Sequence, residues 1–338
     1  MKKIILSAIM LTGMLTFAQE SKLNISGTVD VYAKTNLNAD HGVTPTSSFA
    51  NQSGFALGMA NLIASYDGAK SGVVADLVFG PRGNDAVFGS TAGSTPIVNQ
   101  LYVYYNVTES TTLTLGNFNT FLGYEVISPA ANFNYSTSYL FSYGPFSHTG
   151  IKLDYAATED LSFMLAAMNG TDNTDYNITG NVVLGGQIGF KGQYLNLIYG
   201  NSGAGDQFQI DYTGGFDLSD AFYVGINASY NTTDAGEDDP TYYGAALYLQ
   251  YAVSDTFSLG LRPEYFYEEN GFGAINEDAT DMEGDIFALT LTGNIKLDDS
   301  LTLIPEIRMD SASEASFAKD GVDEKSMSSI LVAAVYSF

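Results

Sequence analysis

The chain has 338 residues, of which 13 are Lys or Arg and 38 are Asp or Glu, so its formal net charge is −25. This acidic balance argues against a nucleic-acid partner, because phosphate binding needs a basic face. The absence of Cys excludes thiol catalysis, disulfides and Cys-ligated metals. Charged residues make up only 15% of the chain, and the 45% of apolar residues argues against disorder.

Residues 1–18 have the features of a signal peptide that is removed on export. Met1-Lys2-Lys3 is positively charged, residues 4–15 are mostly apolar, and Ala18 ends a short segment before the expected cleavage at Gln19. A buried first helix is the alternative. Removal leaves 11 basic residues against 38 acidic ones, a net charge of −27. We therefore expect residues 19–338 to form an exported protein.

The mature chain alternates apolar and polar residues over long segments, starting with the twelve residues from Leu23 to Lys34. A strand that crosses a bilayer needs about 9–11 residues, whereas soluble strands are most often about 5–6 long. Pro263 and Pro305 interrupt two such segments and predict local bulges. The expected strands are 23–37, 53–67, 71–80, 97–107, 111–120, 147–157, 160–170, 181–190, 193–201, 206–217, 220–231, 241–252, 255–268, 284–297, 300–311 and 326–338.

The connections between these segments alternate between short turns and longer loops. This pattern predicts an all-β fold, an antiparallel up-and-down transmembrane β-barrel of sixteen strands with short periplasmic turns and long external loops. A soluble sandwich or propeller is the alternative, but its polar faces would carry more charge, and no repeat of blade length is present. The last strand places Tyr336 and Phe338 on its apolar face, which resembles the terminal signal that the outer-membrane assembly machinery recognises.

The residues expected to face the lumen are polar and often small, including Gly185, Gly225 and Gly260. Sixteen strands leave an aqueous channel, and a small lining leaves room for water, so the sequence predicts a pore. Residues 121–146 form the longest loop, which is aromatic and almost uncharged, with Glu125 as its only carboxylate. We expect this loop to fold into the lumen, where it either constricts the pore or plugs it.

Charged residues on the expected inward faces form a second candidate set. Arg262 and Glu264 lie on one strand, and Glu306 and Arg308 on another. These charges either create a transverse field that orients a polar solute or form salt bridges that support the wall. The other members of the set are Asp30, Lys34, Asp76, Lys152, Asp154 and Asp211.

Catalytic and metal motifs are missing. No Gly-x-Ser-x-Gly, His-Glu-x-x-His or phosphate-loop motif occurs, and no acidic loop fits the EF-hand pattern. His148 is expected in the lumen, but Ser147 precedes it directly on a strand and must point to the opposite face. We expect no enzyme activity and no cofactor. The acidic external loops are expected to be solvated or bridged to lipopolysaccharide by divalent cations.

Several motifs between residues 75 and 155 resemble those of the putative beta-barrel porin-2 family, which is OmpL-like. They are Phe79-Gly80-Pro81-Arg82-Gly83, Gln100-Leu101-Tyr102-Val103, Leu115-Gly116-Asn117-Phe118, Gly123-Tyr124-Glu125, Asn132-Phe133-Asn134-Tyr135-Ser136 and Gly144-Pro145-Phe146-Ser147-His148-Thr149-Gly150. The resemblance implies an outer-membrane channel for small hydrophilic solutes, and we include Arg82 among its expected pore residues. Asn117 stands where a basic residue is expected, which would change the charge preference if it lines the pore.

Together these features predict an outer-membrane porin for passive diffusion of small hydrophilic solutes, with a weak preference for cations because of the net charge of −27. A non-conducting barrel that serves as an adhesin or envelope scaffold, plugged by residues 121–146, is the rival from another class. A hydrolase that depends on His148 is a third. The expected partners are outer-membrane lipid, lipopolysaccharide and the assembly machinery. A homotrimer is compatible with the sequence, but Gly is too widespread to locate its interface.

Overall fold

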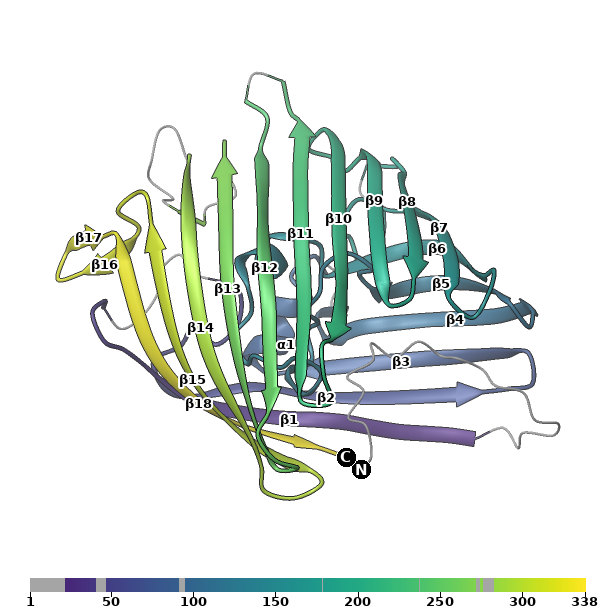
Figure 1. Ribbon diagram of the computed structural model, residues 1–338. Helices are drawn as coiled ribbons and strands as arrows, with labels where there is room; N and C mark the ends of the chain where they lie inside the picture. Colours follow the sequence, from purple (N-terminus) through teal and green to yellow (C-terminus); the bar gives the residue numbers. More distant parts are fainter. Residues whose placement is uncertain are drawn as a thin grey trace.

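The computed structural model describes residues 22–40, 47–90, 95–177, 179–236, 238–271, 274–275 and 283–338. Within them sixteen antiparallel strands form one closed barrel, in which each strand pairs with its neighbours in the chain and β1 pairs with β18 (Figure 1). The predicted all-β fold with sixteen strands is confirmed. Residues 1–18, the expected signal peptide, lie outside the described residues.

The barrel strands agree with the predicted ranges to within three residues at each end. They are β1 Lys22–Asn36, β2 Gly54–Asp67, β3 Ser71–Phe79, β4 Val98–Thr108, β5 Thr111–Asn119, β6 Ser147–Ala156, β7 Leu161–Met168, β8 Val183–Phe190, β9 Gln193–Asn201, β10 Asp206–Asp217, β11 Phe222–Asp234, β12 Thr241–Ala252, β13 Phe257–Glu269, β14 Gly284–Lys296, β15 Leu301–Ala312 and β18 Ser326–Ser337. The loop between β15 and β18 adds a hairpin of β16 Phe317–Lys319 and β17 Val322–Glu324.

Each strand presents an apolar face outward, and the inward face is more polar on most strands, although that of β18 is itself mostly apolar. On β18, for example, Ile330 and Val332 are 41% and 46% exposed, whereas Leu331 and Ala333 between them are buried. The outward apolar side chains suit contact with lipid, and strict alternation follows from the pleat. No helix in the described part of the chain is long and apolar enough to cross a membrane.

The bulges predicted at the two prolines are wrong. The pairing register is unchanged across Pro263 and Pro305, where a few ladder pairs are missing instead, because proline has no N–H to donate. The register shifts lie elsewhere, between Val29 and Val31 on β1, between Asp76 and Leu77 on β3, and near Asn106 on β4.

The short turns lie at the end of the barrel that carries both the start of β1 and the end of β18, and the long loops lie at the opposite end. Between β8 and β9 the turn is Lys191-Gly192, and both residues have positive φ angles of 53° and 78°, as a tight hairpin turn requires. We refer to the two ends as the short-turn end and the long-loop end.

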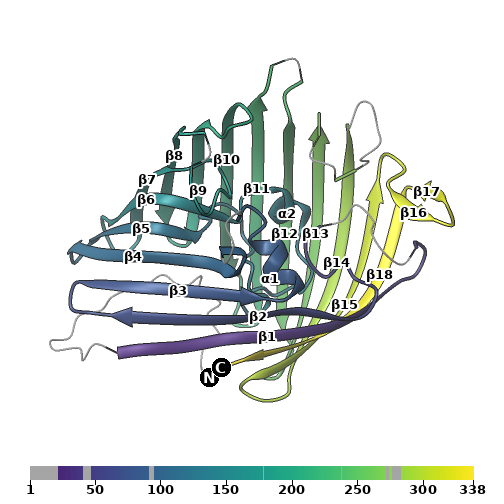
Figure 2. The ribbon, with the colours of Figure 1, turned by 180° about the vertical axis from the view of Figure 1, so that it is seen from behind.

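Three long-loop connections fold into the middle of the lumen. Residues 47–52 come from the β1–β2 loop, α1 Pro81–Ala86 from the β3–β4 loop, and residues 120–146 from the β5–β6 loop, which contains the helix α2 Tyr139–Tyr143. Figure 2 shows α1 and α2 within the ring of strands. The predicted inward fold of residues 121–146 is confirmed, and we call the three segments together the loop layer.

Candidate functional site in the barrel lumen

A buried ion pair fixes the first half of the β5–β6 loop to the wall. Arg262 on β13 donates through Nη1 to Glu125 Oε1 at 2.5 Å and to the carbonyl oxygen of Ser136 at 2.7 Å. The second carboxylate oxygen of Glu125 accepts from the backbone N–H and hydroxyl of Ser138 at 2.7 and 2.5 Å. Both charged side chains are almost fully buried, so each depends on the other for its charge compensation.

The two wall glutamates bind the backbone of the same loop. Glu264 accepts the N–H groups of Tyr139 and Leu140 at 3.0 and 2.9 Å, at the start of α2. Glu306 on β15 accepts the N–H groups of Tyr135 and Ser136 at 3.1 and 3.3 Å, as well as the Ser136 hydroxyl. Charge-assisted hydrogen bonds of this kind are the strong ones.

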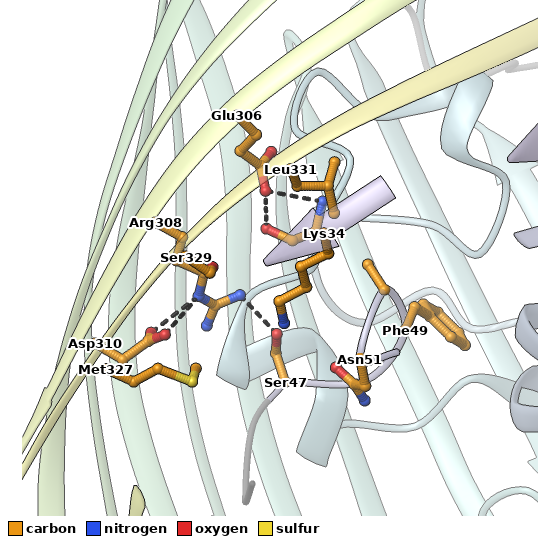
Figure 3. A pocket seen from close by; sticks show the side chains of 12 residues that line it. Lys34, Ser47, Phe49, Asn51, Glu306, Arg308, Asp310, Met327, Ser329 and Leu331 are labelled. Atoms are coloured by element: carbon orange, nitrogen blue, oxygen red, sulfur yellow. Dashed lines mark hydrogen bonds and ion pairs between the residues drawn. The ribbon is translucent and has the colours of Figure 1, made fainter. Parts of the chain in front are cut away.

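Two further arginines connect the inward segments to one another. Arg308 binds Asp310 through Nε at 2.9 Å, and its Nη1 donates to Ser47 Oγ at 2.6 Å and to the Thr137 carbonyl at 2.8 Å (Figure 3). Beside it lies a cavity of about 10 Å³, room for about one water molecule, toward which Lys34 also points.

Arg82 plays the same part for α1. Its Nε and Nη1 donate to the carbonyl oxygens of Ile127 and Tyr135 at 2.9 and 3.3 Å, and its guanidinium lies 4.5 Å from the centroid of the Phe49 ring. The Tyr135 hydroxyl in turn donates to Asp30 on β1 at 2.5 Å. The loop layer is thereby fastened to the wall from β1 across to β13.

Glycines on the wall seat aromatic rings of the loop. A Cβ atom built at Gly225 would lie 2.5 Å from the Tyr124 hydroxyl, and one at Gly260 would lie 2.2 Å from the Phe133 ring. Gly185 receives Phe121 in the same way. The expectation that these glycines leave room for water is therefore wrong, because aromatic side chains occupy that space.

His148 and the pair of Lys152 and Asp154 also face the lumen, on β6. His148 is buried, with Nε2 3.0 Å from Thr120 Oγ1, and lies against Phe121 with ring centroids 5.1 Å apart. Lys152 binds Asp154 at 2.6 Å, and both remain partly exposed toward the short-turn end. As expected, Ser147 faces away from His148.

Asn117 does not line the pore. It lies on the same face of β5 as the exposed Leu115, and its amide donates to Ser147 and Thr149 on the outward face of β6. Its neutral side chain therefore cannot set the charge preference of the lumen directly.

A latch at the long-loop end holds the end of the β5–β6 loop. The carboxylate of Asp172, in the β7–β8 loop, accepts the N–H groups of Phe146 and Ser147 at 2.8 and 2.9 Å. Burial of this carboxyl group raises its pKa to about 7, although the two hydrogen bonds act in the opposite direction. Phe146 packs against Phe141 and Phe49, so the latch joins the end of the β5–β6 loop to residues 47–52.

The wall side chains around the middle of the lumen are buried beneath the loop layer. Those at most 4% exposed include Asp30, Asp76, Thr114, His148, Met164, Asn196, Asp211, Asn227, Arg262, Thr290, Glu306 and Ala333. In the described part of the chain, no group of three or more acidic or His residues is arranged to hold a metal ion.

The structure brings most of the predicted lumen residues together, but Arg262 and Arg308 do not form ion pairs with the nearby glutamates of their own strands. Arg262 bonds Glu125 rather than Glu264, and Arg308 bonds Asp310 rather than Glu306. The sequence reasoning missed Asp310 and the contributions of Ser47 and Phe49. Apolar Phe49 in a polar external loop is the signal that could have indicated an inward segment.

A closed sixteen-stranded barrel with an apolar exterior and loops folded into its lumen defines the class of outer-membrane porins. The chain belongs to the family described as putative beta-barrel porin-2, OmpL-like, whose model matches residues 22–338. No curated protein matches the sequence.

Solved structures with a similar fold are outer-membrane proteins. The outer membrane channel DcaP of Acinetobacter baumannii has 13% identity and a TM-score of 0.62, with 94% of this chain and 97% of that chain covered. The anion-selective porin from Comamonas acidovorans has 14% identity and a TM-score of 0.61, with 94% and 100% covered. A trimer form of OmpT from Vibrio cholerae has 14% identity and a TM-score of 0.58, with 95% and 100% covered. These likenesses show a shared fold.

Proposed function

We propose that this porin allows passive diffusion of small hydrophilic solutes through a path that the loop layer constricts. The observation that carries the proposal is the anchoring of residues 120–146 by Glu125, Arg262, Glu264 and Glu306, which holds a loop across the middle of a wide barrel. Passage then depends on the width and lining of this level rather than on chemistry.

Single-channel conductance in a planar bilayer tests the constriction. The protein with residues 121–145 replaced by a short Gly-Ser linker is expected to give larger steps than the intact protein. Shortening the β11–β12 loop, where Ala235, Gly236, Asp238 and Asp239 are exposed, serves as the control and should leave the steps unchanged. Equal steps from the intact and linker proteins would contradict the constriction.

A weak preference for cations is part of the proposal. The short turns between the strands carry mostly acidic residues, such as Asp67, Glu109, Glu159 and Asp160, and the mouth they form attracts cations. A KCl gradient should give a reversal potential of cation-selective sign, which E159Q/D160N moves toward zero and K70Q moves away from it. A reversal potential of anion-selective sign would refute the proposed cation preference; the similar porin from Comamonas acidovorans is described as anion-selective.

A non-conducting barrel that acts as an adhesin or envelope scaffold is the second candidate. The burial of wall side chains all around the middle of the lumen favours it, because no described side chain at that level faces open water over much of its surface. Silence of the intact protein in the bilayer, with conductance only from the linker protein, would support this candidate and exclude the diffusion pore.

We further propose that the signal peptide 1–18 directs export and that the assembly machinery recognises Tyr336 and Phe338 during insertion into the outer membrane. We also propose that the acidic external loops contact lipopolysaccharide and that the barrel forms a homotrimer. N-terminal sequencing of the mature protein tests the cleavage, and light scattering of the purified barrel tests the trimer. We propose no catalysis, and esterase activity that is lost in an H148A variant would contradict this.

A further inference from the structure

A strip of uncharged aromatic and amide side chains lies on the lumen face of β11–β14, on the short-turn side of the loop layer. The wall contributes Tyr223 on β11, Gln250 on β12 and Asn294 on β14, and the β5–β6 loop contributes Tyr124 and Phe133. We call these five residues the aromatic–amide strip. Unlike the buried ring of wall side chains, all five are partly exposed.

The strip is continuous from strand to strand. Tyr223 and Gln250 are direct cross-strand partners, and Gln250 is in turn opposite Gly260, the seat of the Phe133 ring. The Tyr124 hydroxyl donates to that of Tyr223 at 3.2 Å. Asn294 donates to the Phe133 carbonyl oxygen at 2.9 Å, which completes the strip on β14.

Glycines hold the rings flat against the wall. A Cβ atom at Gly215 would lie 1.8 Å from the Tyr223 hydroxyl, so this ring covers a position without a side chain. Tyr124 stacks on the buried Tyr248 with ring centroids 4.0 Å apart and an interplanar angle of 19°. A ring that lies along a wall keeps one face toward the lumen.

The polar groups of the strip are neutral hydroxyl and amide groups. The Gln250 side chain interacts with the Tyr124 hydroxyl and is partly exposed in the lumen. Beneath the strip, Glu125 and Arg262 are buried and compensate each other. At its short-turn edge the exposed Asp217, the cross-strand partner of Tyr223, and Lys296, two residues after Asn294, carry opposite charges. Ring faces beside amide groups, without a net charge, suit a ligand that has apolar C–H faces and many hydroxyl groups.

We propose that the aromatic–amide strip binds neutral polyhydroxylated solutes, with the C–H face of a sugar ring against Tyr223 and Phe133 and the sugar hydroxyls bonded to Gln250 and Asn294. The inference deepens the proposed diffusion function by naming its solute class. If the rings only cover glycines, the strip fills space and binds no sugar.

Equilibrium dialysis of the detergent-solubilised barrel against labelled maltotriose tests the strip without requiring conductance. Y223L keeps an apolar side chain but removes the flat ring together with the hydroxyl that accepts from Tyr124, and we expect it to weaken binding by about tenfold. Y104L is the matched control, because Tyr104 on β4 also covers a glycine, Gly72, and is partly exposed in the lumen, but lies off the strip. It should bind like the unaltered protein.

Each result has one meaning. The proposal is overturned if maltotriose shows no saturable binding, or if Y223L and Y104L lose binding equally. It is also overturned if tetramethylammonium chloride displaces maltotriose at a 100-fold lower concentration than that of the sugar, since that would identify a cation site. Reduction of the KCl current by maltotriose, weaker in Y223L, is the second expected result. Silence in the bilayer with binding intact would refute the diffusion function but leave the sugar site standing.

Discussion

Replacing Arg262 with Met removes the positive half of the buried pair that holds the β5–β6 loop. Glu125 would then remain buried without charge compensation, which costs about 3–5 kcal/mol. The five hydrogen bonds that Glu264 and Glu306 receive from residues 135–140 are charge-assisted and worth about 1.5–3 kcal/mol each, so together they exceed this loss. We therefore expect the loop to loosen around Glu125 without leaving the lumen.

The assay combines bilayer conductance with the temperature at which the barrel unfolds in detergent. R262M should unfold at a lower temperature and give steps between those of the intact and linker proteins. The double variant R262M/E125Q has no buried charge at this place, and the oxygen of the introduced amide can still accept from Ser138. It should recover most of the lost stability, because well-packed neutral replacements of a buried pair are often tolerated.

The double variant decides whether charge compensation is the cause. If R262M/E125Q is as unstable as R262M, the loss comes from packing of the Arg262 side chain and the reasoning is refuted. If R262M unfolds like the unaltered protein, the pair does not hold the loop at all.

Three further changes follow from the same contacts. G260A should displace the Phe133 ring, lower stability by about 1–3 kcal/mol and raise conductance, whereas G293A, whose Cβ would meet only ordinary contacts of 3.4 Å or more, should change neither. Burial raises the pKa of Asp172 from 3.8 to about 7, so the folded state holds this proton more tightly than the unfolded state does. The unfolding temperature should therefore fall as pH rises from about 4 to about 7. D172N should remove this part of the pH dependence, and an unchanged pH profile in D172N would contradict the reasoning. Deletion of Phe338, whose backbone closes the β1–β18 seam, should lower the yield of folded barrel in the outer membrane, and a normal yield would argue against its role as the assembly signal.

The strands were predictable because the bilayer imposes both their length and their alternation. A residue on the wrong face stands out against such a regular background, as Phe266 does on β13. The structure shows that Phe266 is an inward residue, packed among Tyr139, Tyr143 and Tyr242 at α2. The exception to the pattern therefore marked the place where the loop meets the wall.

The partners of the lumen charges were not predictable, because they depend on the path of the loops. Arg262 and Glu125 are 137 residues apart, and nothing near either residue in the sequence fixes their distance. Arg308 likewise reaches Ser47 and Thr137, in two different loops. Alternation places a charge on a face of its own strand but says nothing about which segment lies opposite.

Glycine shows most clearly where reasoning from one strand fails. Gly225 and Gly260 have no side chain, so the space above them can hold water or an aromatic ring from another segment. The choice depends on an aromatic residue elsewhere in the chain, and here Tyr124 and Phe133 in an almost uncharged loop supply the rings. A barrel with many inward glycines and an aromatic inward loop should therefore be expected to have a narrower path than its strand count suggests.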